Sequence, residues 1–440
     1  MPNLTLFPID VTPDCRPVIF NPLHFGEKLL QQHTVDCFIR IERDRIEFIN
    51  THQKEIMAGN YECVNKYLED IAEKQNAQVQ EKIILPSTFT GSPRFYAEHY
   101  EDAMAIVRYF GTPDLFITMT CNPEWPEIKE AIKHDFPDGT SLQQQANFRP
   151  DIVTRVFKLK SDQLLDDIEN GEIFGKVAAT VSVIEFQKRG TPHMHLLLIF
   201  DKYNKIKSPE EIDDFICAEL PNKDEDPTLH HIVVKFMVHN PCGDLNPEAP
   251  CMVAKNGKPQ CRFNFPKTFQ TETSLIENEM PKYRRRYYEC YDYRSNQFSH
   301  ADAVYRKDQN GQKITRDNRH VVPYNPHGLK KYNCHIDVEY VGGVKSVKYL
   351  YKYIYKGHDM AKLKIDGDAK HILYNECNQH IEGRYVTAPE ACWRLWEFEL
   401  QQKSHTVIRL EIHLKGKHRR AEQLPTNQAD IGQNRSHLEA

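Results

Sequence analysis

Two apolar, β-branched runs joined by a short turn constrain the fold of this chain most strongly. The first run spans Val177 to Gln187 and the second spans His193 to Phe200, with a Lys-Arg-Gly-Thr-Pro turn over residues 188–192 between them. Runs of this length on either side of a Gly/Pro turn predict two strands that pair as antiparallel neighbours. The fold must therefore contain a sheet built around this hairpin.

Length and composition narrow the class of protein. Single hydrophobic cores stop growing near roughly 250–300 residues, so a chain of 440 residues is expected to form more than one unit. With 40% hydrophobic and 27% charged residues, and no run near the roughly 18 apolar residues of a membrane span, no membrane partner is expected. The first residues lack the features of a secretory signal, so the twelve cysteines are expected to be reduced thiols or metal ligands.

The charge pattern bears on nucleic-acid binding in two opposite ways. A net charge of −5 does not favour a nucleic-acid partner. Locally, however, Lys282 to Tyr288 reads Lys-Tyr-Arg-Arg-Arg-Tyr-Tyr, and Lys345 to Lys356 interleaves four lysines with four tyrosines. Cations that meet phosphates, beside rings that stack on unpaired bases, suit single-stranded nucleic acid. Solvated surface is the alternative interpretation of both runs.

Periodicity and composition divide the chain into five parts. Helical spacing of apolar residues dominates the N-terminal part, and further helices are expected over Glu98 to Phe110 and Arg155 to Ile168, with a buried strand over Leu115 to Met119. The parts are a mainly helical region 1–90, the first part of the main domain 91–227, a Cys/His insert 228–290, the remainder of the domain 291–415, and a polar tail 416–440.

The second strand of the hairpin carries a histidine pair. Residues two apart on a strand share a face, so His193 and His195 can offer two imidazoles to one ion. On the preceding strand Glu185 and Gln187 also share a face, and either can complete the site. Two imidazoles and one oxygen suit Mn²⁺ or Mg²⁺ with open positions, whereas a structural zinc needs four protein ligands. Two ordinary histidines at a sheet edge are the alternative.

A tyrosine-rich segment is the second element that carries chemistry. In a helix, Tyr349 and Tyr353 stack one turn apart, and Tyr351 and Tyr355 form another such pair on a different face. Strict alternation also permits a strand, and an aromatic stripe can simply pack. Tyrosine ionises near pH 10, so it attacks poorly unless a metal polarises the electrophile or a cation such as Lys352 favours the phenolate.

A Cys/His group in the insert predicts a structural metal. One imidazole and three thiolates make a tetrahedral zinc set, although paired Cys-x2-Cys knuckles are missing and either His230 or His231 can replace the first member. Buried free thiols in an irregular insert are the alternative. The group is spaced as His239-x2-Cys242-x8-Cys251-x9-Cys261.

Five motifs, in this order and together, resemble those of Helitron rolling-circle transposon proteins over about residues 29–413. Phe116 to Pro123 looks like the first motif of rolling-circle initiators, and Glu185 to His195 looks like the HUH motif in its Helitron form. Lys348 to Tyr353, ending in a Lys-Gly pair, resembles the two-tyrosine motif. The segments Val321 to Pro326 and Pro281 to Arg286 are similar to non-catalytic family signatures.

The resemblance implies an α+β fold, with an HUH-type antiparallel sheet, histidines on a central strand and the tyrosine helix packed across the site. It implies a nuclear, metal-dependent endonuclease and strand transferase that acts on single-stranded DNA through a 5′-phosphotyrosine. A helicase domain in the same polypeptide is the implied partner. The implied roles are metal ligands at His193, His195 and Glu185, with Gln187 as the alternative third ligand, and nucleophiles at Tyr349 and Tyr353, assisted by Lys352.

No ATPase activity is expected from this sequence. The string nearest to a P-loop, Gly171 to Val177, has the wrong spacing and lacks the final hydroxyl residue. The chain is therefore expected to be either an N-terminal piece of a larger protein or a decayed or domesticated copy. Two other functions stay open: an inert DNA-binding remnant with the same fold, and a metal hydrolase whose site begins at the histidine pair.

Overall fold

The computed structural model describes residues 26–56, 62–133, 141–186, 190–255, 257–275, 280–292, 297–300, 304–307, 313–341 and 371–408. Residues 1–405 form one compact unit, and residues 406–440 are assigned to a second. The described part of the first unit is a mixed α+β structure, as the sequence predicts. Among the described helices, none is both long and apolar enough to cross a bilayer.

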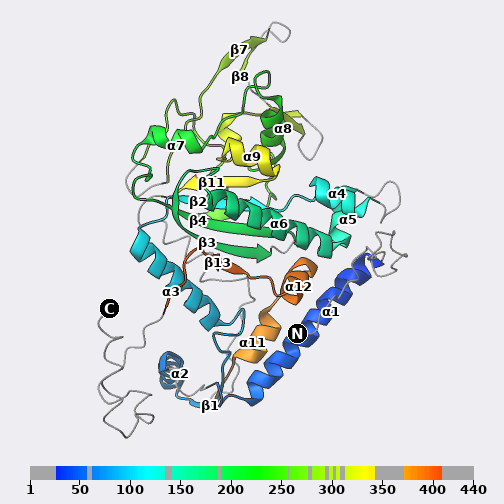
Figure 1. The fold of residues 1–440 in the computed structure, drawn as a ribbon, viewed down its shortest axis with the longest axis vertical. Coiled ribbons are helices and arrows are strands. Elements are labelled where there is room, and N and C mark those ends of the chain that lie inside the picture. Colours follow the sequence, from blue (N-terminus) through cyan, green and yellow to red (C-terminus); the bar gives the residue numbers. More distant parts are fainter. Residues whose placement is uncertain are drawn as a thin grey trace, which may run out of the picture. The chain divides into compact units, whose positions relative to one another are not determined.

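A five-stranded antiparallel sheet forms the centre of the first unit (Figure 1). Its middle strand is β4, which carries the histidine pair, and the predicted hairpin is the β3–β4 pair. In spatial order the strands are β11 (Ile336–Tyr340), β2 (Leu115–Thr120), β4 (Pro192–Phe200), β3 (Val177–Phe186) and β13 (Gln401–Lys403).

One face of this sheet is apolar and is covered by helix α6 (Pro150–Glu169). Met194 and Leu196 of β4 belong to the same buried cluster as Phe157 and Leu164 of the helix. Each such side chain contributes roughly 1.5–3 kcal/mol by leaving water. Because side chains alternate along a strand, the residues between these apolar ones lie on the opposite face. The packing of α6 against the apolar face therefore supports the sheet that carries the histidines on its opposite face.

Helix α3 (Pro93–Phe110) begins five residues earlier than the sequence pattern predicts. The Ser92 hydroxyl accepts a hydrogen bond from the Phe95 amide at 2.9 Å, and Pro93 fits the first turn, where no amide donor is needed. The helix ends as predicted at Gly111, whose φ of 98° suits glycine. An ion pair between Asp102 and Lys403 joins α3 to the edge strand β13.

The long helix α1 (Lys28–Thr51) packs against C-terminal helices through a buried ionic network. Glu42 of α1 pairs with Arg384, which also binds Glu390 with 2.9 Å between Nη2 and Oε1. The Nε2 atom of His380 lies 3.4 Å from Glu42 Oε1. The partner elements are α11 (Glu376–Gly383), the segment that follows it, and α12 (Ala388–Leu395). The N-terminal helix is thus tied to residues more than 300 positions later in the chain.

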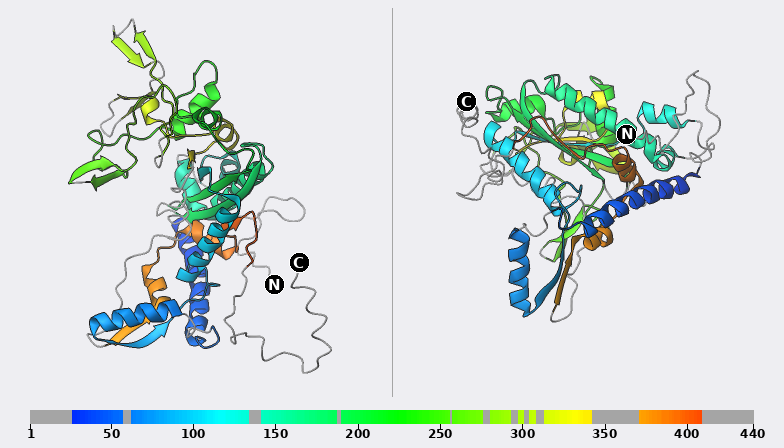
Figure 2. Two further views of the ribbon diagram at one scale, coloured as in Figure 1. Left: turned by 90° about the vertical axis from the view of Figure 1, so that its left-hand side faces the viewer. Right: turned by 60° about the horizontal axis from the view of Figure 1, so that its bottom comes forward.

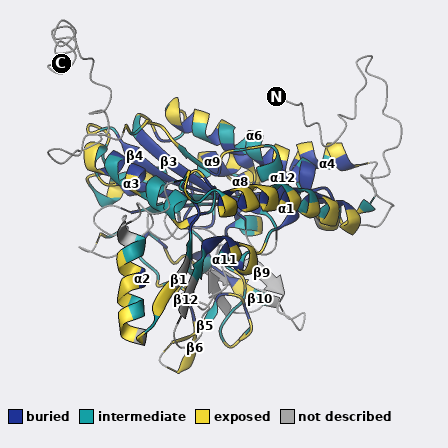
Figure 3. Cartoon of the chain, turned by 90° about the horizontal axis from the view of Figure 1, so that it is seen from below, coloured by how far each residue is buried: buried dark blue, intermediate teal, exposed yellow. Residues whose placement is uncertain are grey.

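A parallel two-stranded sheet makes a second link between the ends of the chain. Strand β1 (Gln78–Ile83) pairs with β12 (His371–Asn375), and α2 (Glu62–Gln75) precedes β1 (Figure 2). The region 1–90, predicted to be mainly helical, therefore also contributes a strand. Figure 3 shows the outward sides of α1 and α2 as exposed and the central strands β3 and β4 as buried.

The polar part of the chain after β4 contains more regular structure than its composition indicates. Residues 281–335, predicted to be irregular, include two short antiparallel pairs, β7 with β8 and β9 with β10. The remaining elements are α4 (Pro126–Ile132), α5 (Leu142–Phe148), α7 (Pro209–Phe215), α8 (Pro227–Phe236), β5 (Met252–Lys255), β6 (Lys258–Cys261), β7 (Glu289–Asp292), β8 (Gln297–His300), β9 (Val304–Lys307), β10 (Lys313–Arg316), the 3₁₀ helix η3 (Asn318–His320) and α9 (Pro326–Tyr332).

Candidate active site and metal cluster

The histidine pair is buried on the face of the sheet opposite α6. His193 and His195 are each 7% exposed. Strand pairing places His193 between Thr120 of β2 and Glu185 of β3, and places Thr118 beside His195. Directly opposed residues in an antiparallel pair share a face. The sheet therefore brings together two imidazoles, two hydroxyls and a carboxylate from three adjacent strands.

Two threonine hydroxyls fix the orientation of the imidazole rings. Thr120 Oγ1 lies 2.9 Å from His193 Nδ1, and Thr118 Oγ1 lies 3.1 Å from His195 Nδ1. Because Nδ1 is engaged in both rings, Nε2 is the atom left to bind a ligand, as is usual in metal-binding histidines. The sequence analysis missed these threonines, although their i, i+2 spacing in the strand Leu115–Thr120 is the signal that could have found them.

The Nε2 atoms meet two different environments. His195 Nε2 lies 2.9 Å from Glu185 Oε2. His193 Nε2 is buried and has no hydrogen-bond partner among the described residues. Leaving a buried polar atom unpaired costs about 1–3 kcal/mol, so this atom fits a ligand bound from the open side. Two imidazoles and a carboxylate of this kind match the ligand set of a divalent ion.

Electrostatics keep His193 ready for such a ligand. Burial, reinforced by the nearby His195 and His335 side chains, lowers the pKa of His193 to about 4, against a smaller opposing effect of Glu185. The imidazole is therefore neutral near pH 7, and a metal does not have to displace a proton from it.

Of the other residues that the sequence analysis assigned to this site, only Glu185 is among those that the structure describes. Glu185 lies beside the histidines, whereas its alternative Gln187 lies outside the described residues, as do Tyr349, Tyr353 and Lys352. Among the residues described, only the cysteine cluster below gathers three or more His, Cys, Asp or Glu ligand atoms into one compact group. The ligand atoms of the histidine pair and Glu185 are thus less closely grouped than those of the cysteine cluster.

Strand β11 and the residue before it add two polar side chains that the sequence analysis missed. The amide of Thr120 donates to the His335 carbonyl at 2.9 Å, and Asp337 pairs with Thr118. His335 Nδ1 and Asp337 Oδ1 are buried without a hydrogen-bond partner in the described part of the chain. Burial, and then Glu339, raise the pKa of Asp337 well above its usual range, and burial lowers the pKa of His335. The alternation His-x-Asp-x-Glu over residues 335–339 is the signal that marks this face.

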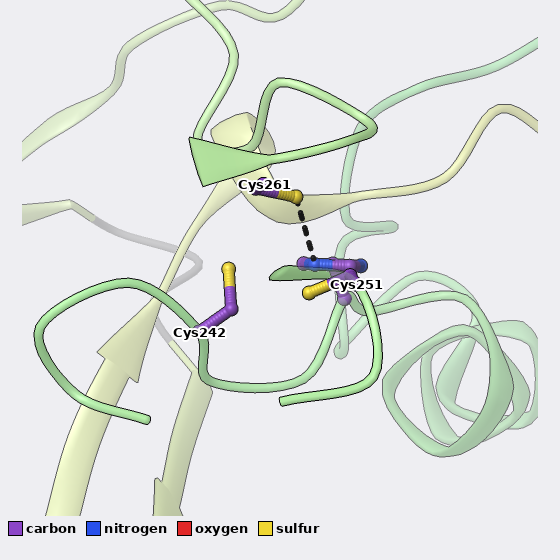
Figure 4. A group of neighbouring side chains, drawn as sticks. Cys242, Cys251 and Cys261 are labelled. Atoms are coloured by element: carbon purple, nitrogen blue, oxygen red, sulfur yellow. Dashed lines mark hydrogen bonds between the residues drawn. The ribbon is translucent and has the colours of Figure 1, made fainter. Parts of the chain in front are cut away.

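The Cys/His insert forms a compact cluster of the four predicted residues. The ligand atoms of His239, Cys242, Cys251 and Cys261 all lie within 4.8 Å of one another, and Figure 4 shows the three thiols turned toward one another. Cys261 Sγ lies 3.6 Å from His239 Nε2. The described cluster includes neither of the alternative histidines on α8. The group can hold a metal ion such as zinc.

Local backbone structure positions the cluster. Pairing of Met252 with Cys261 across the β5–β6 hairpin sets Cys251 and Cys261 side by side. The amide of His239 donates to the carbonyl of His320 at 2.8 Å, which fixes the start of the insert. The turn after Cys242 is made at Gly243, with a φ of 69°. Residues 22 positions apart in the chain are thus brought to one point.

Two of the three thiols disfavour ionisation in this arrangement. Burial and the neighbouring Cys261 raise the pKa of Cys242 to about 12, and burial raises the pKa of Cys251. Burial also opposes ionisation of Cys261, but the backbone amides of Phe265 and Phe263 outweigh it and lower the pKa of Cys261. Crowding three thiols in this way fits a cation that would stabilise them as thiolates.

The basic run at residues 284–286 is engaged within the protein. Arg284 pairs with Asp213 at 3.0 Å and Arg286 with Glu219 at 2.6 Å. Arg285 is buried and donates to the backbone carbonyls of residues 218, 318 and 321. These arginines, which the sequence analysis interpreted as DNA contacts or solvated surface, also organise the insert around its own acidic and carbonyl groups.

A comparison with protein families identifies the first part of the chain. Residues 11–198, less than half of the chain, match the model of the family described as Helitron helicase-like domain at N-terminus. This part of the chain is similar to the N-terminal domain of Helitron transposon proteins. The matched residues include β2, β3 and the histidine pair of β4, whereas the Cys/His cluster and β11 follow the matched part. The match supports a relationship to Helitron transposon proteins over these residues. No curated protein matches the chain.

Proposed function

We propose that this Helitron-related protein nicks and rejoins single-stranded DNA through a tyrosine nucleophile, with a divalent ion held by His193, His195 and Glu185. The observation that carries the proposal is the pair of buried imidazoles on the central strand. Threonine hydroxyls fix their Nδ1 atoms, His193 Nε2 is left for a ligand, and His195 Nε2 faces the Glu185 carboxylate. Glu185 supplies the oxygen ligand, because its carboxylate already lies beside His195.

The nucleophiles in this proposal are Tyr349 and Tyr353, taken from the family resemblance. A bound Mn²⁺ or Mg²⁺ supplies polarisation of the scissile phosphate. The oxygen of one tyrosine attacks phosphorus, the bond from phosphorus to the 3′-oxygen breaks, and the released 3′-hydroxyl takes up a proton. Lys352 favours the phenolate that attacks. The link retains the energy of the broken bond, and the second tyrosine allows a second strand to be joined.

The same resemblance supports two further parts of the proposal. The protein acts in the nucleus on transposon ends, and a helicase domain of the same polypeptide supplies unwound strands. The cysteine cluster takes Zn²⁺ with a structural role, since all four positions of a tetrahedral ion are provided by the protein.

The proposal is tested by trapping the covalent intermediate. The protein is incubated with a fluorescent pool of single-stranded oligonucleotides of randomised sequence and Mn²⁺ or Mg²⁺, and protein-DNA adducts are sought on a denaturing gel. We expect an adduct that disappears in the double variant Tyr349→Phe, Tyr353→Phe and in His193→Ala. The matched control Tyr351→Phe, in the same segment, should keep it.

Two results would contradict the proposal. Absence of an adduct from a protein that binds the metal would identify the chain as an inert DNA-binding remnant. An adduct that persists in His193→Ala would show that the histidine pair is not the catalytic metal site.

A further inference from the structure

A cavity of about 600 Å³ lies beside β11. Asp337 and Glu339 of β11 and the preceding residue His335 line it on one side, and Phe265, Lys267 and Tyr283 line it from the insert. His335 is close enough to His193 to act on its charge. The cavity has the size of the small-molecule sites that proteins use for nucleoside-sized groups, roughly 300–1,000 Å³.

Two of the polar side chains that line the cavity have buried atoms without partners. His335 Nδ1 and Asp337 Oδ1 are shut off from solvent and form no hydrogen bond to any described residue. Each atom of this kind costs about 1–3 kcal/mol unless a partner is supplied. Asp337 as a residue is only half-buried, so a donor group in the cavity can reach its carboxylate even though Oδ1 itself is shut off. This observation is independent of the presence of the cavity.

The chemistry of the walls selects among ligands. Two acidic side chains, Asp337 and Glu339, disfavour an anionic group at their end of the cavity. A metal ion is disfavoured, because the described residues of this cavity do not bring three ligand atoms into a compact group. A neutral, planar group with donors on its edge fits both the carboxylates and the aromatic rings of Phe265 and Tyr283.

The cation next to these rings suits the phosphate of a nucleotide. Lys267 Nζ lies 5.0 Å from the centre of the Phe265 ring, and it donates to the Phe263 carbonyl at 2.7 Å. Phe265 also stacks on His239 of the metal cluster, with 4.2 Å between ring centres. The cluster therefore holds in place the aromatic wall of the cavity.

We propose that this cavity binds one unpaired nucleobase with an exocyclic amino group, which donates to Asp337. The base belongs to single-stranded DNA whose neighbouring phosphate lies at the histidine pair, so this placement of the strand rests on the proposed function. Base recognition in the cavity itself needs no cleavage. It gives the protein a preference for adenine, cytosine or guanine over thymine, which has no exocyclic amine.

Binding of homopolymers tests the proposal without cleavage. Fluorescein-labelled dA12, dC12 and dT12 are titrated with the full chain by fluorescence anisotropy, with zinc retained and without Mn²⁺ or Mg²⁺. We expect dA12 or dC12 to bind roughly tenfold more tightly than dT12, since one good base contact discriminates by about that factor. Asp337→Asn should bring this ratio close to one and leave dT12 binding nearly unchanged.

Matched variants separate base recognition from charge and from catalysis. Asp224→Asn makes the same change at an exposed position and should keep the preference. His193→Ala removes the proposed metal site and should also keep it. A covalent adduct in the cleavage assay, without any base preference in binding, would refute base recognition in the cavity but not the nuclease proposal. A base preference without an adduct would refute the nuclease proposal alone.

A measurement on the unaltered protein covers the case in which Asp337→Asn does not fold, as judged by circular dichroism. A dC12 oligonucleotide with 5-iodocytosine is cross-linked by light, and the attached peptides are identified by mass spectrometry. We expect attachment at Phe265 or Tyr283. Equal affinity for all three homopolymers, an unchanged ratio in folded Asp337→Asn, or attachment only at other parts of the protein would each refute the proposal.

Discussion

Replacing Thr120 by valine tests whether the threonine hydroxyls prepare the histidine pair for a metal. Valine keeps the shape of the side chain and removes the oxygen that lies 2.9 Å from His193 Nδ1. Because His193 is only 7% exposed, water does not readily replace the lost partner. Loss of a hydrogen bond to a ligating histidine weakens metal binding by roughly 10–100-fold, which corresponds to about 1.4–2.8 kcal/mol.

The assay is titration of Mn²⁺ into the protein, followed by isothermal calorimetry, after the cysteine cluster has been saturated with Zn²⁺. Thr180→Val is the matched control, since Thr180 lies on β3 of the same sheet and its hydroxyl donates to Glu169, at 3.1 Å, away from the histidines. We expect weaker Mn²⁺ binding in Thr120→Val only. Equal affinities in a folded Thr120→Val protein would refute the idea that this hydroxyl orients the ligand.

Three other predictions concern the cluster, the histidine and the ionic network. Cys251→Ser should lower bound zinc from about one ion per chain, measured by atomic absorption after dialysis, and the same loss in Cys37→Ser would contradict a role for the cluster. Because burial lowers the folded-state pKa of His193 from 6.5 to about 4, the unfolded chain binds its proton first. The stability of the metal-free protein should therefore be greatest above pH 6.5 and fall by roughly 3 kcal/mol toward pH 4. Urea unfolding should show a smaller fall in His193→Gln, and an identical fall would exclude this cause. Arg384→Met should destabilise the protein by about 3–5 kcal/mol, since it leaves Glu42 and Glu390 buried without their cation. A loss below about 1 kcal/mol in thermal unfolding would show that the network contributes little.

The sequence pattern was sufficient to predict a structural feature where all of its residues lie in one short segment of the chain. The hairpin that contains His193 and His195 follows from two apolar runs and a turn, and the strand period alone sets both imidazoles on one face. The residue types of the Cys/His group, one imidazole and three thiols, likewise predict the cluster that the structure assembles. Helix α3 shows the limit of pattern, because its first turn is set by the Ser92 cap and not by apolar periodicity.

By itself, then, the sequence determined the α+β class, the hairpin, the histidine pair and the four residues of the cysteine cluster. Only the tertiary structure decided what surrounds them. Strand order placed Thr118 and Thr120 on one side of the histidines and Glu185 on the other, and it brought Asp337 from more than 140 positions away to the same face. The physical reason is that strand pairing depends on hydrogen bonds and burial between distant segments, which no local period records.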